Sequence, residues 1–416
     1  IGVRLVGSEM CIRDSIHTIE EHGFKAYAVG GCIRDSILGR NPDDWDITTS
    51  AVPSQIKTFF KRTVDTGIAH GTVTIMIDKT GYEVTTYRID GEYEDGRHPK
   101  SVEFSDRLVD DLCRRDFTIN AMAYNDTDGF VDEFKGLDDL DTKIIRCVGE
   151  PELRFTEDAL RMMRAIRFSA QLGFTIDEAT WNAIKKLSPS ISKISMERVH
   201  VELGKTLMSA HPDYVAQYSE AGLFAPILPV IDNALKSRYK RKILATLQHT
   251  PDNIYLRYAA LFITSTPDEA AKTLRALKLD NKTVNTVSKL VELSKMDIEE
   301  TEPAVRTALN KYGRDFLTLW HELMMAVIQA SEDITGISNP AKVKHLLTLK
   351  RLGTDILARG DCFTIKDLDI SGNDLIEYGL QGHEIGETLK SLLDIVIENP
   401  KLNDKATLIA MIEHIK

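Results

Sequence analysis

Short apolar runs and Gly-bearing turns alternate over roughly the first 150 residues. Runs rich in β-branched and aromatic residues, bounded by turn residues, predict strands over 26–29, 72–77 and 82–86. Short helical segments lie between these runs. This part of the chain is therefore expected to be an α/β region.

Beyond residue 150 the pattern changes to a succession of amphipathic segments. Helix starts such as Thr156-Glu-Asp and stops such as Pro226 and Pro229 predict helices only. A chain of 416 residues with 43% hydrophobic content exceeds the size of a single core. We expect an α+β protein of several domains, with boundaries near residues 150, 215 and 300.

The beginning of the chain contains an unusual repeat. The string Cys-Ile-Arg-Asp-Ser occurs at 11–15 and again at 32–36, and residue 1 is not Met. Residues 1–14 look like a translated sequencing adapter, so we expect them to be non-native and the natural N-terminus to be missing.

The overall charge argues against a general nucleic-acid binder. The chain has 52 Lys and Arg against 63 Asp and Glu, a net charge of −11. Two local basic patches could still contact RNA, although either could be an ordinary solvated helix face. They consist of Lys236, Arg238, Lys240, Arg241 and Lys242, and of Lys342, Lys344, His345, Lys350 and Arg351.

The cellular location is predicted from what the sequence lacks. It shows no apolar run of membrane-spanning length and no leader pattern. Its five cysteines are scattered, without the paired spacing of zinc sites or disulfide frameworks. We expect a soluble cytoplasmic protein with reduced thiols.

Two neighbouring motifs could bind a nucleotide and a metal ion. Gly30-Gly31 follows an apolar strand and precedes a short helix with Arg34, so backbone N–H groups and a cation could meet phosphates, although an ordinary tight turn gives the same pattern. In Asp44-Trp45-Asp46-Ile47, strand alternation places both carboxylates on one face. Such a pair suits Mg²⁺, and two ions could support transfer to a 3′-hydroxyl with pyrophosphate as leaving group.

A third motif is Arg114-Arg115-Asp116, at the end of a helical segment beginning near Ser105. Asp116 is the preferred third carboxylate of the acidic cluster, with Glu83 as the alternative, and Arg115 would lie near phosphates or ribose. Asp116 could instead simply cap a turn.

A fourth motif lies on a helix predicted to open at Thr156. Asp158, Arg161, Arg164 and Arg167 recur every three residues and occupy one side of that helix. An Asp and an Arg side by side can meet the edge of an unpaired base, whereas a solvated face is the plain alternative.

These motifs, in this order, resemble the class II tRNA nucleotidyltransferases, or CCA-adding enzymes, and their poly(A) polymerase relatives. The likeness runs from Ala26 to the C-terminus and includes Ser195-Met-Glu-Arg198 and Ile370-Ser-Gly-Asn-Asp-Leu375. It implies a nucleotidyltransferase head (15–150) with a mixed or antiparallel sheet, then a helical neck (151–215), body (216–300) and tail (301–416).

The resemblance also implies an activity and residue roles. The activity is template-independent addition of C, C and A to the 3′ end of tRNA from CTP and ATP, with Mg²⁺ held by Asp44 and Asp46. Gly30, Gly31, Arg34 and Arg115 would hold the triphosphate and ribose. Asp158 and Arg161 would read the base, and Arg164 and Arg167 would line its pocket. The tail would hold tRNA, and a homodimer is allowed for.

Two further features narrow the activity. The stretch from Arg88 to Arg107 is expected to be a loop that relatives adding only CC have shortened, so its presence favours addition of the terminal A. No His-Asp dipeptide occurs in the chain, which predicts no phosphohydrolase activity. Three alternatives remain at this point: an enzyme that adds only A, a poly(A) polymerase, and an inactive RNA-binding relative.

Overall fold

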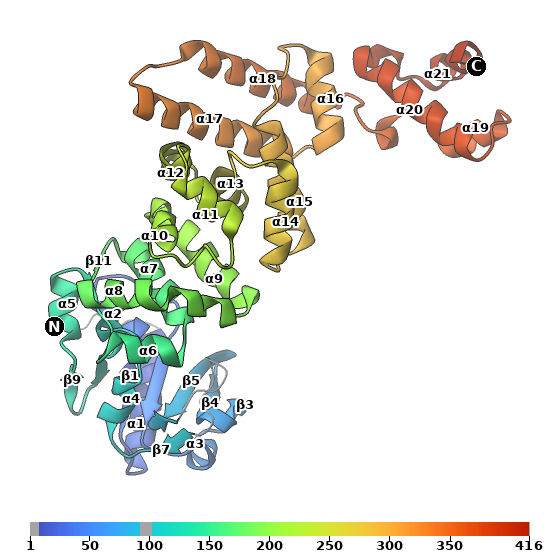
Figure 1. Cartoon of the computed structure of the whole chain (residues 1–416). Coiled ribbons are helices and arrows are strands. Elements are labelled where there is room, and N and C mark those ends of the chain that lie inside the picture. Colours follow the sequence, from blue (N-terminus) through green and yellow to red (C-terminus); the bar gives the residue numbers. More distant parts are fainter. Residues whose placement is uncertain (1–7, 92–101, 416) are drawn as a thin grey trace. The chain divides into compact units, whose positions relative to one another are not determined.

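The computed structural model describes residues 8–91 and 102–415. The chain divides into two compact units, Ile1–Asp232 and Asn233–Lys416. Each unit is described by itself. The predicted α+β class is confirmed, because one mixed sheet in the first part of the chain is followed by many helices (Figure 1).

The first unit is organised by a seven-stranded sheet with the order β3-β4-β5-β2-β1-β8-β9. The pairing of β2 with β5 is parallel and the other pairings are antiparallel. The strands are β1 (Ala26–Val29), β2 (Asp46–Thr49), β3 (Thr63–Gly67), β4 (Thr72–Ile77), β5 (Thr80–Thr86), β8 (Ala123–Asn125) and β9 (Gly129–Val131). The three strands predicted from apolar runs are therefore confirmed.

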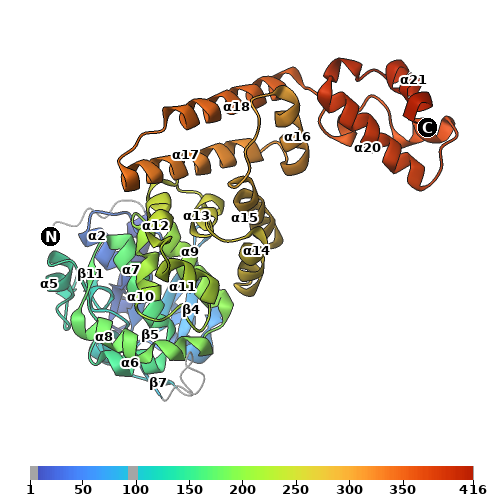
Figure 2. The ribbon, with the colours of Figure 1, turned by 45° about the horizontal axis from the view of Figure 1, so that its top comes forward.

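Helices of the first unit surround this sheet and continue beyond it (Figures 1 and 2). They are α1 (Ser8–Glu21), α2 (Gly31–Ile37), α3 (Pro53–Phe59), α4 (Leu108–Cys113), α5 (Gly136–Asp141), α6 (Pro151–Glu157), α7 (Leu160–Leu172), α8 (Glu178–Leu187), α9 (Met196–Leu207), α10 (Val215–Glu220) and α11 (Pro229–Lys236), whose last residues belong to the second unit. A short parallel pairing joins β10 (Ile144–Ile145) to β11 (Thr175–Ile176), and β11 is a small exception to the all-helical expectation after residue 150.

The prediction of one helix opening at Thr156 is wrong. Thr156 lies in the last turn of α6, and α7 begins only at Leu160. Asp158 between them has an extended backbone with φ −142° and ψ 104°. Its carboxylate accepts the backbone N–H of Leu160 at 3.0 Å, which caps the new helix. The carboxylate of Asp158 thus separates two helices in a segment whose sequence has the periodicity of one continuous helix.

Two other stretches differ in part from expectation. Residues 8–14, predicted to be non-native, form the first turns of α1, where Ile12 is buried. Their origin stays a prediction. The ends of the expected loop form a two-stranded ribbon of β6 (Arg88–Asp90) and β7 (Val102–Phe104). Its centre, including Gly96, lies outside the described residues.

The second unit is helical throughout its described residues. Its longest helices, α17 (Phe316–Thr335) and α18 (Pro340–Arg359), lie side by side (Figure 2). The others are α12 (Lys240–His249), α13 (Ile254–Leu261), α14 (Pro267–Ala276), α15 (Asn281–Leu293), α16 (Glu302–Tyr312), α19 (Gly372–Glu377), α20 (His383–Glu398) and α21 (Lys405–Ile415).

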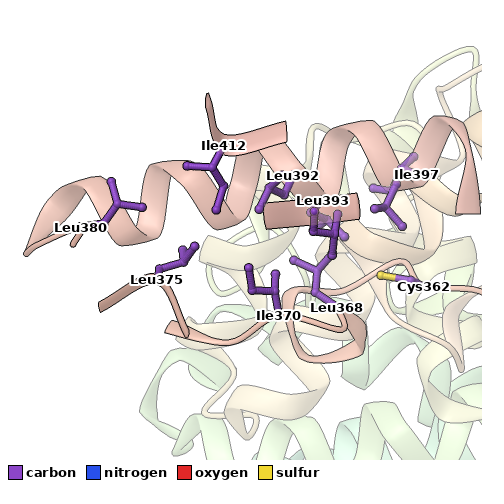
Figure 3. Close-up of a cluster of buried hydrophobic side chains, with 11 residues drawn as sticks. Cys362, Leu368, Ile370, Leu375, Leu380, Leu392, Leu393, Ile397 and Ile412 are labelled. Atoms are coloured by element: carbon purple, nitrogen blue, oxygen red, sulfur yellow. The ribbon is translucent and has the colours of Figure 1, made fainter. Parts of the chain in front are cut away.

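The C-terminal part of this unit has an apolar core of its own. Buried aliphatic side chains of α20, such as Leu392 and Leu393, meet Leu375 of α19 and Ile412 of α21 (Figure 3). None of the described helices combines the length and apolar content that a bilayer crossing requires.

Candidate active site

The acidic pair lies at the start of β2. Trp45 and Ile47 are buried, at 7% and 0% exposure, whereas Asp44 and Asp46 are exposed. The expected alternation is therefore present, although the strand itself begins only at Asp46. Both carboxylates remain accessible to a ligand.

A third carboxylate lies next to this pair. Because β2 and β5 run parallel in register, Asp46 is directly opposite Glu83, which is also exposed. The pKa of Asp46 is raised, first by the protein that displaces water around it and then by the charges of Glu83 and Asp44, against the opposing effect of Arg115. Negative charge is thus concentrated at a point where a bound cation would reduce the repulsion between the carboxylates.

This acidic group fits Mg²⁺ as part of a composite site. Among the residues that the structure describes, no three His, Cys, Asp or Glu side chains converge closely enough to hold a metal alone. Mg²⁺ usually takes one or two carboxylates and completes its shell with substrate phosphates and water. Exposed, adjacent carboxylate oxygens satisfy that requirement.

The Gly30–Gly31 turn faces an arginine. Gly30 has φ +86°, a conformation that L side chains rarely adopt. A Cβ added there would lie 2.8 Å from the guanidinium NH1 of Arg115, so the glycine also allows close approach. Helix α2 starts at Gly31, and Arg34 follows in its buried part. The structure thus brings Gly30, Gly31, Arg34 and Arg115 together.

Asp116, expected from the sequence as the third carboxylate of the acidic group, is paired with an arginine and an amide in this structure. Its Oδ2 accepts Nε and NH2 of Arg164 at 2.7 and 2.6 Å, and its Oδ1 accepts the side-chain amide of Asn120 at 3.0 Å. The carboxylate is 8% exposed. Burial would raise its pKa, but Arg164, Asn120 and Arg161 together hold the pKa well below the usual range. Asp116 is therefore paired with Arg164 of α7.

This network continues from Asn120 to Arg34. The Asn120 Oδ1 accepts NH1 of Arg34 at 2.6 Å, and Arg34 also pairs with Asp35 at 2.7 Å. One chain of hydrogen bonds therefore connects helix α2 of the sheet region with Arg164 of α7.

The aromatic ring of Phe168 also contacts active-site arginines. The guanidinium carbons of Arg34, Arg164 and Arg167 lie 5.0, 5.3 and 3.6 Å from its centroid. Arg167 also pairs with the buried Glu202 at 2.7 Å. Three of the predicted nucleotide-binding arginines are therefore held together around one aromatic ring.

Asp158 and Arg161, expected to read the base, lie at the α6–α7 junction. Arg198 of α9 donates to the two oxygens of Asp158 at 2.7 and 3.3 Å. Arg161 pairs with Glu157 at 2.7 Å and donates to the backbone oxygen of Arg114 at 3.0 Å. Both side chains therefore have protein partners.

Several of these contacting residues were not singled out as site residues from the sequence. Asn120, Phe168, Glu202 and Arg198 all contact predicted site residues from distant positions, and of these only Arg198 stood in a motif carrying the family resemblance. Local pattern carries no signal for pairings such as Asp158–Arg198, which are 40 residues apart.

Comparisons with known proteins agree with this fold. Residues 26–146 match the model of the Poly A polymerase head domain, 173–235 that of an RNA and SrmB binding site of polymerase A, and 252–412 that of tRNA nucleotidyltransferase domain 2. Fold and site together define a nucleotidyltransferase of the poly(A) polymerase class.

Curated relatives narrow this class. A CCA-adding enzyme of Limosilactobacillus fermentum is 37% identical over 404 residues, which cover 95% of this chain and 94% of the relative. That of Pediococcus pentosaceus is 34% identical over 405 residues, 95% of this chain and 96% of the relative. The chain belongs to the family of CCA-adding enzymes.

A solved structure supports the same assignment. The Bacillus stearothermophilus CCA-adding enzyme in complex with CTP matches with a TM-score of 0.75 at 31% identity, covering 97% of this chain and 96% of that one. The likeness therefore extends over both compact units.

Proposed function

We propose that this protein adds C, C and A in turn to the 3′ end of tRNA, using CTP and ATP. Membership of the CCA-adding enzymes supports the reaction. The similar Bacillus stearothermophilus enzyme was solved with CTP. The observation that carries the proposal is the acidic group of Asp44, Asp46 and Glu83 beside the Gly30–Gly31 turn and Arg115.

The proposed roles follow from this placement. Asp44 and Asp46 would hold Mg²⁺, and Glu83 rather than Asp116 is the third carboxylate that we assign to this group. When bound, Mg²⁺ would stabilise charge on the phosphoryl oxygens and lower the pKa of the attacking 3′-hydroxyl. The N-terminus of α2 at Gly31, with Arg34 and Arg115, would orient the triphosphate.

Base choice would fall to the α6–α7 junction. Asp158 offers acceptors and Arg161 offers donors, the combination required to pair with the edge of a base without a template. Both side chains would exchange some of their present partners, Arg198 and Glu157, for the incoming nucleotide. Arg164 and Arg167 would form the wall of this pocket.

The assay that tests the function is the length of the product on truncated tRNA. Purified protein, Mg²⁺, CTP and ATP are supplied with tRNA ending at the discriminator base and, separately, with tRNA ending in CC. We expect C, C and A on the first and a single A on the second. Failure to extend the first while extending the second would show an A-adding enzyme. A long A homopolymer on unrelated RNA would show a poly(A) polymerase.

A change at Arg161 is expected to alter nucleotide choice. Arg161→Gln shortens the donor that would face the base, so the preference between CTP and ATP should fall by about tenfold, the contribution of about one hydrogen bond. Single-turnover rates with each nucleotide measure this preference.

The matched control is Arg154→Gln. Arg154 also pairs with Glu157, at 2.5 Å, but it lies on α6 before the junction. This variant should keep the wild-type preference. Equal losses with both nucleotides in Arg161→Gln, at unchanged preference, would exclude the base-reading role.

A further inference from the structure

Beneath the active-site arginines lies a carboxylate that the proposed reaction does not use. Asp111 of α4 is 0% exposed. Its Oδ1 accepts Nε and NH2 of Arg114 at 2.9 and 2.6 Å. Its Oδ2 accepts NH2 of Arg115 at 3.2 Å and the hydroxyl of Thr48 at 3.1 Å. One buried side chain therefore joins two arginines to a strand.

That strand is the one on which Asp46 lies. Thr48 follows Asp46 by two residues on β2, and residues two apart share a face of a sheet. Helix α4 packs on β2, so Asp111 lies over the face that presents the acidic pair. The position of Asp111 is thereby fixed relative to Asp46 by a direct hydrogen bond to the same strand.

Among the described residues, Asp111 is the side chain that holds the Arg115 guanidinium by a hydrogen bond. NH2 makes this bond, whereas Nε is buried and has no hydrogen-bond partner within the described part of the chain. Its NH1 lies against Gly30, where a Cβ would be only 2.8 Å away. The charge of Arg115 also acts on Asp46, to which it is attracted. Opposite charges attract, so an unanchored Arg115 guanidinium would be drawn toward the carboxylates of Asp44 and Asp46 and away from the glycine turn.

We propose that Asp111 is a positioning residue for nucleotide binding, which holds the Arg115 guanidinium against the Gly30–Gly31 turn and apart from Asp46. The inference rests on the proposed function, since it requires that Arg115 face the phosphates or ribose of the nucleotide. It assigns to a fully buried carboxylate a role that is transmitted through Arg115 and independent of the base.

The direct test is a double-mutant cycle with Asp111→Asn and Arg115→Ala. Asp111→Asn should raise KM for CTP and for ATP by about tenfold, because a charge-assisted hydrogen bond that orients Arg115 is lost. KM for tRNA and the CTP-to-ATP preference should stay within about twofold. In the Arg115→Ala background the same substitution should change KM by less than about twofold, since the residue through which it acts is absent.

Arg114→Ala provides the matched control background. Arg114 also bonds to Asp111, so a role transmitted through Arg114 would abolish the effect of Asp111→Asn there instead. We expect the tenfold rise to persist in that background. Equal rises in KM with and without Arg115, or a fall in kcat at unchanged KM, would overturn the proposal.

Thr48→Val keeps the test decisive if Asp111→Asn does not fold. It removes the hydroxyl that donates to the Asp111 carboxylate and should raise KM for both nucleotides about threefold, less than the loss of the carboxylate charge itself. Unchanged KM would contradict the role of Asp111. Wild-type protein is assayed first on tRNA lacking CCA. If the wild-type protein adds no C there, the proposed function fails. If it is active but the effects of Asp111→Asn and Arg115→Ala on KM simply add, only the role of Asp111 fails.

Discussion

Asp46→Asn is expected to lower the rate of C addition by about a thousandfold, while tRNA still binds. A metal ion contributes several kcal/mol to the stabilisation of transition-state charge, and each ~1.4 kcal/mol corresponds to tenfold in rate. The amide keeps the shape of the side chain and removes the charge that would hold Mg²⁺. Single-turnover incorporation of labelled C, together with a tRNA-binding titration, measures both properties.

Asp43→Asn is the matched control for this prediction. Asp43 is also exposed and precedes Asp44, but it lies in a bend before β2, outside the alternation that places Asp44 and Asp46 together. Its replacement should leave the rate within about twofold, the usual outcome for a surface substitution. A comparable loss in both variants would indicate a general effect of acidic charge, and full activity of Asp46→Asn would refute its metal-binding role.

Asp116→Asn is expected to destabilise the protein by about 3 kcal/mol without changing its requirement for Mg²⁺. The Asn oxygen can still accept from Asn120 and from the backbone N–H of Phe117, so the change isolates the charge opposite Arg164. Breaking a buried pair typically costs about 3–5 kcal/mol, and the lower end applies because Arg164 is partly exposed. Denaturant unfolding and a Mg²⁺ titration of activity give the two quantities.

The stabilisation by Asp116 should depend on pH in a defined direction. The pKa of this carboxyl in the folded protein lies below the ordinary value of about 3.9. Its contribution is therefore complete above pH ~4 and is lost as the pH falls toward the folded pKa. The difference in stability between wild type and Asp116→Asn should shrink over this acidic range. A difference that grows on acidification would contradict the assignment.

A second variant distinguishes a structural partner from a metal ligand. Adding Arg164→Met to Asp116→Asn removes the unpaired cation and should restore part of the lost stability. Glu83→Gln should show the opposite behaviour, with little change in stability and a higher Mg²⁺ requirement. If Asp116→Asn raised the Mg²⁺ requirement instead, Asp116 would be the third carboxylate.

Local pattern was sufficient for much of the first unit. The strand at 26–29 and the exposure of Asp44 and Asp46 follow from alternation and from turn residues, which act over a few neighbouring positions. The order of the motifs was enough to suggest the family. These features depend on near neighbours along the chain.

The parts that the sequence did not reveal depend on contacts across the fold. Glu83 became the preferred third carboxylate only because β5 lies parallel to β2, an order of strands that no local pattern specifies. Asp116 pairs with Arg164, 48 residues away. The break at Asp158 was missed because an Asp favours both a first helical turn and a cap, and only the fold selects the cap.

The central claim is that Asp44 and Asp46 jointly bind a divalent cation beside the nucleotide. Electron paramagnetic resonance of Mn²⁺, titrated into protein with CTP, measures bound metal directly against an equal concentration of CTP alone. Wild-type protein should bind more Mn²⁺ than CTP alone, and Asp44→Asn/Asp46→Asn should lose this excess while remaining folded. Equal Mn²⁺ binding by wild type and by this double variant would contradict the claim.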